Sequence, residues 1–480
     1  MSQVTEIVSP AAGLRRRLGL ISAIAVVAGE VIGVGIFLTP AEMSKSMGSP
    51  VLIASVWLVM GGLSILGGLC YGELAARYPE AGGGYIYLRE AYGPRVAFLY
   101  GWKCFLVMDP GLTAALAAGI AAYVGYVVAV GPAASKLLAI GCVLIICALN
   151  IAGVGLGAFL ARWLTVIKIG VLLFIICWAF GFGLGDWSHF APLAARRVGS
   201  APIGVALAGG FVSAFFSLAG WWDVSRLAGE IRSPQRILPR ALFWGITTVT
   251  VVYLATSAVF LYLVPIERVT SGETFAAQAG EALFGKTGGV VFSAVVIVSV
   301  VGSLAAFIIA APRLYYAMAR DRLFPAVAGW VHPRFGTPVV AIAVQGCLAC
   351  VLVLSGNFRS IVAYFIFITV AFIGLTVGGL FLIRRREGVC GAYQTPGYPY
   401  APAAFVLFVI VLLLVLIVGN PLQALVGTAV VLLGLPVFQF VWKGRESNPA
   451  SVSKRAGILP TAILENNARN ECQEGTSERN

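Results

Sequence analysis

Residues 29–37 read Gly-Glu-Val-Ile-Gly-Val-Gly-Ile-Phe, and Pro40 follows shortly after. The stretch lies in an apolar run long enough to cross a membrane, which takes about 20 residues. Two glycines in such a run predict an interrupted helix, whose freed backbone groups are costly in hydrocarbon unless a polar ligand satisfies them. The alternative is that Gly33 and Gly35 are close-packing contacts between neighbouring helices.

A second interruption follows in the sixth apolar run, where residues 216–221 read Phe-Ser-Leu-Ala-Gly-Trp. The first and sixth runs occupy the first positions of two successive sets of five. Glycine-interrupted spans at corresponding places in two halves of a chain are typical of a transporter binding site. The spacing therefore predicts one site that is built from both interruptions.

Composition places both interruptions in a membrane protein. Of the 480 residues, 59% are hydrophobic and 11% are charged, and the mean hydropathy is +0.93. Soluble domains are about 25% charged, and disordered chains are less hydrophobic. Long apolar runs also disfavour a β-barrel, whose strands alternate. The runs predict about twelve membrane helices at 19–40, 48–73, 95–129, 135–153, 159–184, 203–228, 239–264, 287–318, 337–356, 359–383, 402–419 and 422–442.

The net charge of +13 indicates topology rather than nucleic-acid binding. If the spans alternate from a cytoplasmic N-terminus, most of the Lys and Arg residues fall on the cytoplasmic side, as the positive-inside rule requires. We therefore expect both termini to be cytoplasmic. The predicted domains are a cytoplasmic segment 1–18, a transporter domain 19–443 and a polar, disordered cytoplasmic tail 444–480.

Five motifs occur in order along the chain. They are the I-G-x-G-I-F of residues 32–37, residues 71–85 around Pro-Glu-Ala-Gly-Gly-Gly-Tyr, the F-S-x-x-G-W of residues 216–221, residues 313–321, and residues 384–386 with 398–400. Together they resemble the amino acid–polyamine–organocation (APC) superfamily over about residues 15–443. The Gly-Trp at the second interruption looks most similar to the L-type amino acid transporter branch.

The resemblance implies an all-α LeuT-type fold with helices 1 and 6 broken at the membrane midplane. Two inverted five-helix repeats would occupy about 19–184 and 203–386, with helices 11 and 12 at about 402–442. Family members move amino acids or related amines by exchange or with protons. The implied function is a secondary active transporter that works by alternating access in the inner (cytoplasmic) membrane.

An amino acid zwitterion suits the two ends of a broken helix. Amides at the start of a half-helix favour a carboxylate, and carbonyls at the end of the other half favour an ammonium group. Phe216 matches the family position of an aromatic lid, and the alternative for it is ordinary packing. The expected substrate-binding residues are Ile32, Gly33, Val34, Gly35, Phe216, Ser217, Leu218, Ala219 and Gly220.

Lys168 lies in the middle of the fifth span, where a charged side chain is costly and is a functional candidate by default. Its position matches the family site where an ammonium group replaces a bound sodium ion beside helix 1. The lysine either takes part in proton coupling or is a permanently charged link between helices 5 and 1. Either role predicts sodium independence, and residues 305–309 of helix 8 carry no hydroxyl for a sodium site.

Three acidic residues, Glu30, Asp109 and Asp223, lie within or near the spans. Such groups must be paired or protonated in the membrane. They either select side chains or carry protons, or they form structural pairs such as Glu30 with Lys168. The first reading makes a cationic amino acid or polyamine antiporter the alternative function. A transporter-like amino acid sensor is a more remote alternative.

The remaining motifs predict neither a cofactor nor a catalytic site. Residues 280–287 fit a phosphate-loop pattern but lack the preceding strand, so we expect no ATP binding. No His or Cys cluster suits a metal ion or an enzyme nucleophile. The loop at residues 131–136 has no cysteine, so we expect no disulfide-linked ancillary subunit. The expected partners are an amino acid or amine and the lipid bilayer.

Overall fold

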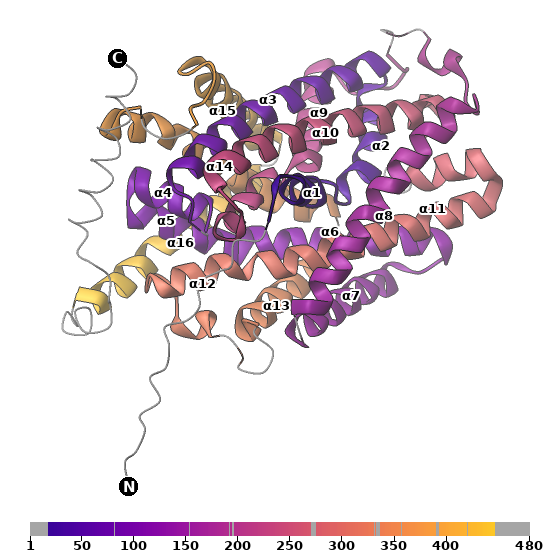
Figure 1. Cartoon of the computed structure of the whole chain (residues 1–480). Helices are drawn as coiled ribbons and strands as arrows, with labels where there is room; N and C mark the ends of the chain where they lie inside the picture. The colour runs from indigo at the N-terminus through magenta and orange to yellow at the C-terminus, as the bar shows by residue number, and fades with distance from the viewer. Residues whose placement is uncertain are drawn as a thin grey trace.

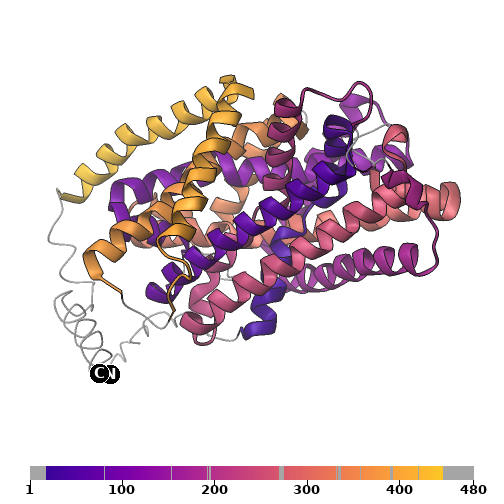
Figure 2. The ribbon, with the colours of Figure 1, turned by 90° about the horizontal axis from the view of Figure 1, so that it is seen from above.

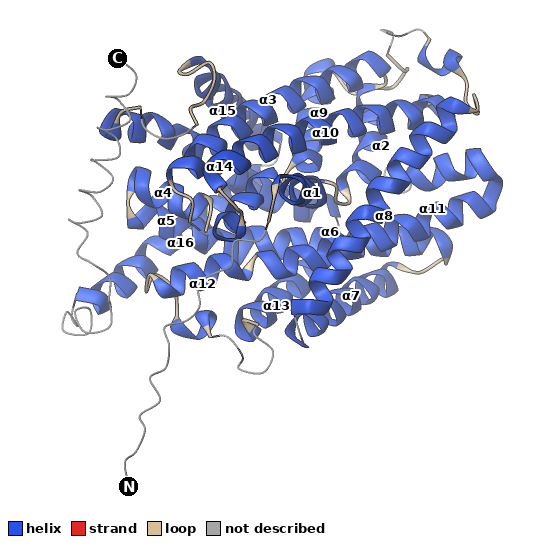
Figure 3. Ribbon diagram, viewed as in Figure 1, coloured by secondary structure: helices blue, strands red, loops and turns tan. Residues whose placement is uncertain are grey.

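A computed structural model gives the fold, and nearly all of its described residues lie in helices (Figure 3). The predicted segments 1–18 and 444–480 lie almost entirely outside the described residues. Within the described part, strand pairing is limited to one isolated bridge between Leu18 and Ile231. The described residues are 18–80, 82–152, 154–191, 193, 196–269, 275–330, 332, 337–356, 358–389, 393–419 and 421–446.

The helices follow one another along the chain with short connections. Those of the first half are α1 (Leu20–Val31), α2 (Gly35–Met47), α3 (Pro50–Arg77), α4 (Gly84–Tyr92), α5 (Pro94–Lys103), η1 (Cys104–Met108), α6 (Asp109–Val127), α7 (Pro132–Ala152), α8 (Val154–Gly181) and η2 (Trp187–Phe190). Those of the second half are α9 (Ile203–Leu218), η3 (Trp221–Glu230), α10 (Pro234–Leu263), η4 (Ile266–Arg268), α11 (Phe275–Ala310), α12 (Pro312–Arg320), η5 (Ala326–Gly329), α13 (Val339–Ser355), α14 (Phe358–Glu387), α15 (Tyr400–Gly419) and α16 (Pro421–Glu446).

The predicted all-α membrane fold class is confirmed. Among the described residues, nine helices are long and apolar enough to cross a membrane, and the bent pair α1–α2 makes up to ten. Shorter apolar helices at Val166–Gly181 and Val339–Ser355 coincide with the predicted fifth and ninth spans. Each predicted span thus falls on a helix or a helix pair. That all twelve cross the membrane, and that they form two inverted repeats, remain predictions.

Proline fixes several helix starts and one irregular turn. Residues Pro50, Pro94, Pro234 and Pro312 begin helices, where their missing amide proton costs nothing. Pro110 instead lies inside the span 94–127, and the π-helical turn η1 directly precedes it. A proline has no amide proton for the preceding turn. The span 94–127 thus contains a widened, π-helical turn just before Asp109 and Pro110.

The broken first helix lies at the centre of the bundle. Figure 1 shows α1 surrounded by other helices, and α1 packs mainly against α10 and η3. The second half of the break, α2, packs against α9, while α10 runs along α3 and α11 runs along α6 and α8. The view from above places α15 and α16 along an outer edge (Figure 2). This arrangement surrounds both interruptions with protein.

Candidate functional site

The first helix is interrupted at residues 32–34, as the glycine spacing predicts. Helix α1 ends at Val31, α2 begins at Gly35, and their axes differ by 47°. The Ile32 amide still donates to Ala28, and the Gly33 amide turns back to the carbonyl of Val31 at 2.7 Å. The first amides of α2 have no acceptor within their own helix. They form a ready anion site next to Gly33 and Gly35.

The sixth helix is interrupted at Ala219 and Gly220. Helix α9 ends at Leu218, Ala219 is extended, and Gly220 has a φ of +102°, which favours glycine. The chain then continues as the 3₁₀ helix η3. A Cβ on Gly220 would lie 3.3 Å from the carbonyl oxygen of Glu30. The second interruption therefore lies directly against the first.

Direct contact between the two interruptions is closest at Gly35. A Cβ on Gly35 would lie 2.7 Å from both Cα and Oγ of Ser217, so the backbones meet where only glycine fits. The Ser217 hydroxyl shares a 2.7 Å hydrogen bond with the hydroxyl of Thr39, which also donates to the Gly35 carbonyl. Helices α2 and α9 are thus joined by a small polar contact.

A cavity of about 60 Å³ lies at this meeting point. Both interruptions supply its walls, as the sequence predicts. Ile32 and Leu218, which were also expected in the site, are buried nearby and lie outside the lining set. The lining residues that the sequence predicted are Glu30, Gly33, Val34, Gly35, Phe216, Ser217, Ala219, Gly220 and Asp223.

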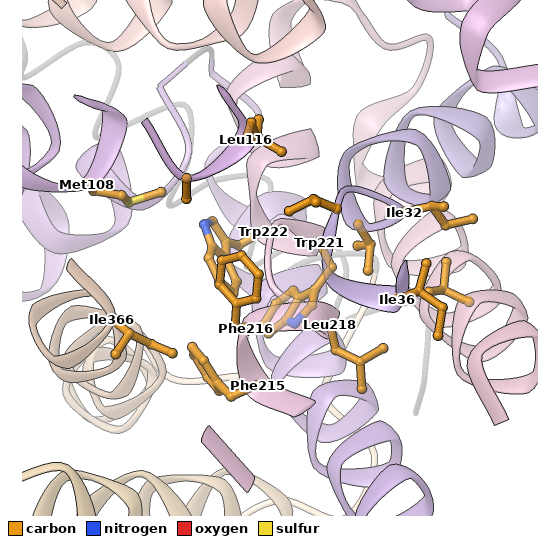
Figure 4. Close-up of a cluster of buried hydrophobic side chains, with 14 of the residues drawn as sticks. Ile32, Ile36, Met108, Leu116, Phe215, Phe216, Leu218, Trp221, Trp222 and Ile366 are labelled. Atoms are coloured by element: carbon orange, nitrogen blue, oxygen red, sulfur yellow. The ribbon is translucent and has the colours of Figure 1, made fainter. Parts of the chain in front are cut away.

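Further side chains, most of them apolar and many from other helices, complete the cavity wall, and sequence reasoning missed them. Figure 4 shows Phe216 and Trp222 between the segment that carries Met108 and Leu116 and the helix that carries Ile366. Trp222 stacks on Phe215, with ring centroids 6.2 Å apart. The lining residues absent from the prediction are Val31, Met108, Leu112, Leu116, Phe215, Trp222, Ser303, Phe307, Ile366 and Thr369. Their helices come together only in the folded chain.

Lys168 reaches the end of α1, as its place in the fifth span suggests. Its buried Nζ donates to the Gly29 carbonyl at 2.6 Å and to the Ser303 hydroxyl at 3.0 Å. The Ser303 hydroxyl lies 3.3 Å from the carbonyl oxygens of both Ile32 and Ser299, and its single proton can be donated to either of them. The eighth predicted span, which is α11, therefore does supply a hydroxyl here. It lies two residues before the stretch 305–309 that the sequence analysis considered. The Lys168 ammonium group already donates to that hydroxyl and to the Gly29 carbonyl.

The carbonyls at the end of α1 are partly used within the protein. Val31 accepts a 2.8 Å hydrogen bond from the hydroxyl of Tyr253 as well as the Gly33 amide. Ile32 can receive only the long bond from Ser303 among the described residues. A carbonyl oxygen has two lone pairs. The Ile32 carbonyl, with that of Glu30, thus retains the capacity to accept from an ammonium group.

The three acidic residues have different surroundings. Asp223 lines the cavity and forms an ion pair with Arg226 at 2.8 Å, and both side chains are buried. Glu30 also lines the cavity. Asp109 does not line it, and its carboxylate accepts a hydrogen bond from the Tyr315 hydroxyl. Sequence reasoning did not include Arg226 in the site, although this residue falls near the end of the predicted span 203–228.

The ends of the two half-helices offer groups that can recognise a small charged ligand. Amides at the start of α2 complement a carboxylate, and carbonyls at the end of α1 complement an ammonium group. Among the described residues, no group of three or more His, Cys, Asp or Glu side chains is placed to hold a metal ion. The arrangement therefore complements a small zwitterion that is enclosed by apolar side chains.

Comparison with known proteins agrees with this geometry. A family model described as "Amino acid permease" matches residues 18–436. The serine/threonine exchanger SteT of Bacillus subtilis is 31% identical over 440 residues, which cover 91% of this chain and 99% of the relative. The human Asc-type amino acid transporter 1 is 30% identical, covering 88% of this chain and 82% of the relative. The human cystine/glutamate transporter is 26% identical, covering 88% and 85%. The chain belongs to the amino acid permease family, within the APC superfamily.

Proposed function

We propose that the protein is a sodium-independent secondary transporter of small neutral amino acids. It works by alternating access, by exchange or with protons. The observation that carries the proposal is the contact between the two helix interruptions at one enclosed cavity. Substrate carboxylate and ammonium groups would bind the backbone at Gly33–Gly35 and at the end of α1, and the side chain would face Phe216 and Trp222.

The size of the cavity favours small side chains. About 60 Å³ is well below the roughly 150 Å³ of an engineered cavity that holds benzene. Bulky apolar groups, Met108, Phe215 and Trp222 among them, limit the space that remains for a substrate side chain. The name of one relative, a serine/threonine exchanger, agrees with substrates of this class.

Replacement of Trp222 is expected to change the preferred substrate size. Trp222→Ala removes an indole from the cavity wall, so larger neutral amino acids such as leucine gain room. A change of a few methylene groups in pocket size changes the preference for one substrate over another of different size by about tenfold or more. We expect the ratio of leucine to serine counterflow to rise by about that factor. Trp244→Ala is the matched control, because Trp244 is 54% exposed on α10. An unchanged leucine-to-serine ratio would argue against Trp222 as a wall of the substrate pocket.

The proposed sodium independence rests on Lys168. Its ammonium lies against the Gly29 carbonyl and the Ser303 hydroxyl, oxygens of the kind that hold sodium ions in proteins. A fixed positive charge there opposes the binding of a second cation. The same group is our candidate for proton linkage, and the role of a permanently charged link remains open.

A cationic amino acid or polyamine antiporter is the second candidate. The Glu30 carboxylate in the cavity wall favours it. The pairing of Asp223 with Arg226 disfavours it, because that carboxylate already has a cationic partner. An amino acid sensor that retains the transporter fold has no specific structural observation in its favour.

We further propose that the protein lies in the cytoplasmic membrane with both termini inside. The distribution of Lys and Arg along the sequence supports this orientation. The absence of a cysteine in the 131–136 loop supports function without a disulfide-linked ancillary subunit. The two interrupted helices serve binding and transport rather than catalysis, and neither ATP nor a cofactor takes part.

A counterflow panel in proteoliposomes tests the proposed function. Vesicles loaded with unlabelled substrate would receive labelled serine, alanine, leucine, lysine or putrescine, with sodium or with choline outside, and with or without a pH gradient. We expect serine or alanine to accumulate equally in sodium and in choline. Accumulation of lysine or putrescine alone would select the second candidate, and a strict sodium requirement would refute the coupling proposal.

A further inference from the structure

The Asp223–Arg226 ion pair is a buried charge pair in the wall of the cavity. Asp223 Oδ1 lies 2.8 Å from Arg226 Nε, and the two residues are 4% and 2% exposed. Asp223 lines the cavity, whereas Arg226 lies outside the lining set. Among the described residues, none of the three guanidinium nitrogens of Arg226 has a hydrogen-bond partner and neither does Asp223 Oδ1, so the contact between them is an ion pair. The guanidinium also lies within electrostatic range of the Asp109 carboxylate, and Asp223 is the carboxylate in direct contact with it.

An unpaired carboxylate in this wall would attract a cationic side chain. Charges interact strongly where water is excluded, because the effective dielectric constant is low. A buried ion with no partner also carries a large desolvation cost. A lysine, arginine or polyamine ammonium group would relieve that cost by pairing with Asp223. In the observed structure the Arg226 guanidinium already fills this role.

The two residues lie three positions apart on the same helical segment, η3. A pair within one helix moves as a unit when helices tilt or slide. We therefore expect Arg226 to accompany Asp223 when this segment moves, unlike a partner supplied by another helix.

The other charged groups nearby have other partners. Lys168 contacts Gly29 and Ser303 beside the Glu30 carboxylate, on the first interruption. Lys103 is buried, with its Nζ 3.0 Å from the Met108 sulfur and 4.7 Å from the Tyr100 ring centre. Asp109 accepts a hydrogen bond from the Tyr315 hydroxyl and also lies within electrostatic range of Arg226 and Asp223. Of the two cavity-lining carboxylates in the described chain, Asp223 is the one with a guanidinium in direct contact.

We propose that Arg226 is an internal counter-cation that excludes cationic substrates by occupying the carboxylate of Asp223. Arg226 acts through Asp223 and is a positioning residue, while Asp223 is the group that faces the substrate. Loss of the guanidinium would convert the neutral site into one that accepts a lysine or arginine side chain. This inference rests on the proposed transport of neutral amino acids.

The test is a gain of function. Arg226→Gln and Arg226→Met remove the charge in two ways, and Arg226→Lys keeps it. Counterflow of labelled lysine and serine is measured for each in the same proteoliposome preparation, after monodisperse elution in detergent is verified. We expect the lysine-to-serine ratio to rise at least about tenfold for the uncharged variants, since measured couplings of close charge pairs exceed about 1.4 kcal/mol. The Arg226→Lys ratio should stay near that of the wild type.

A double variant and a stability measurement complete the test. Asp223→Asn combined with Arg226→Gln should return the ratio to the wild-type value, which assigns the gained selectivity to Asp223 rather than Glu30. Lysine should also raise the Tm of Arg226→Gln and leave that of Arg226→Lys unchanged, because a ligand that binds the folded state stabilises it. The Tm shift detects lysine binding even where transport by the variant is too slow to measure.

Three results would overturn the inference: no rise in the ratio and no lysine-dependent Tm shift for either uncharged variant, an equal rise for Arg226→Lys, or a rise that persists in the double variant. Absence of serine and alanine counterflow in the wild type would instead count against the proposed function itself. The two failures are therefore separate results of one experiment.

Discussion

Gly35→Val is expected to abolish amino acid counterflow in proteoliposomes. A Cβ at this position would lie 2.7 Å from Cα of Ser217, far inside the usual carbon–carbon separation of about 3.5–4.0 Å. The clash is with backbone as well as side chain, so a rotamer change cannot relieve it. Separation of α2 from α9 would also break the 2.7 Å contact between Thr39 and Ser217. The amides of α2 and the carbonyls of α1 would then no longer face one cavity.

Gly62→Val is the matched control for this variant. Gly62 lies on α3 with nothing within 4 Å of the added Cβ, so the same substitution meets open space. We expect its counterflow to equal that of the wild type. Gly35→Val should elute as a folded protein and fail to bind labelled serine in a scintillation proximity assay. Normal uptake by Gly35→Val would place the substrate somewhere other than this cavity.

Lys168→Ala is expected to lower serine counterflow at least about tenfold. The substitution leaves the Gly29 carbonyl and the Ser303 hydroxyl without their charged donor. Hydrogen bonds to a charged group contribute about 1.5–3 kcal/mol, and tenfold corresponds to about 1.4 kcal/mol. The end of α1 would lose its link to α8, and the backbone geometry at the interruption would be less well defined.

The pH dependence of the remaining activity separates the two roles of this lysine. If Lys168 carries the coupled proton, uptake by Lys168→Ala should no longer respond to a pH gradient. If it is a permanently charged link, the rate should fall and the pH response should remain. Lys136→Ala is the control, because Lys136 is exposed near the start of α7. Wild-type uptake that requires sodium would contradict both roles.

The interruptions were predictable from sequence because glycine placement is a local property. Gly33, Gly35 and Gly220 all lie where the backbone leaves the helix or where two backbones meet. Lys168 was predictable for a related reason, since a lysine within an apolar run needs acceptors, and the broken helix supplies them. Both arguments need only the residue and its immediate chain neighbours.

The cavity walls were not predictable, because they depend on how distant helices meet. Ile366 and Thr369 lie on α14, and Phe307 lies on α11, with no local pattern that distinguishes them from lipid-facing residues. Arg226 was misplaced for a different reason. A charged residue near the end of an apolar span ordinarily marks the membrane surface, but in the 3₁₀ helix η3 Arg226 is buried beside Asp223. The sequence signal that pointed to it was a carboxylate three residues earlier.

A structure determined with bound L-serine tests the central claim most directly. We predict that the serine carboxylate contacts the amides at the start of α2, around Gly35. The ammonium group should contact the carbonyls at the end of α1, and the side chain should face Phe216 and Trp222. A sodium ion at the Lys168 site, or serine bound away from the two interruptions, would contradict the account.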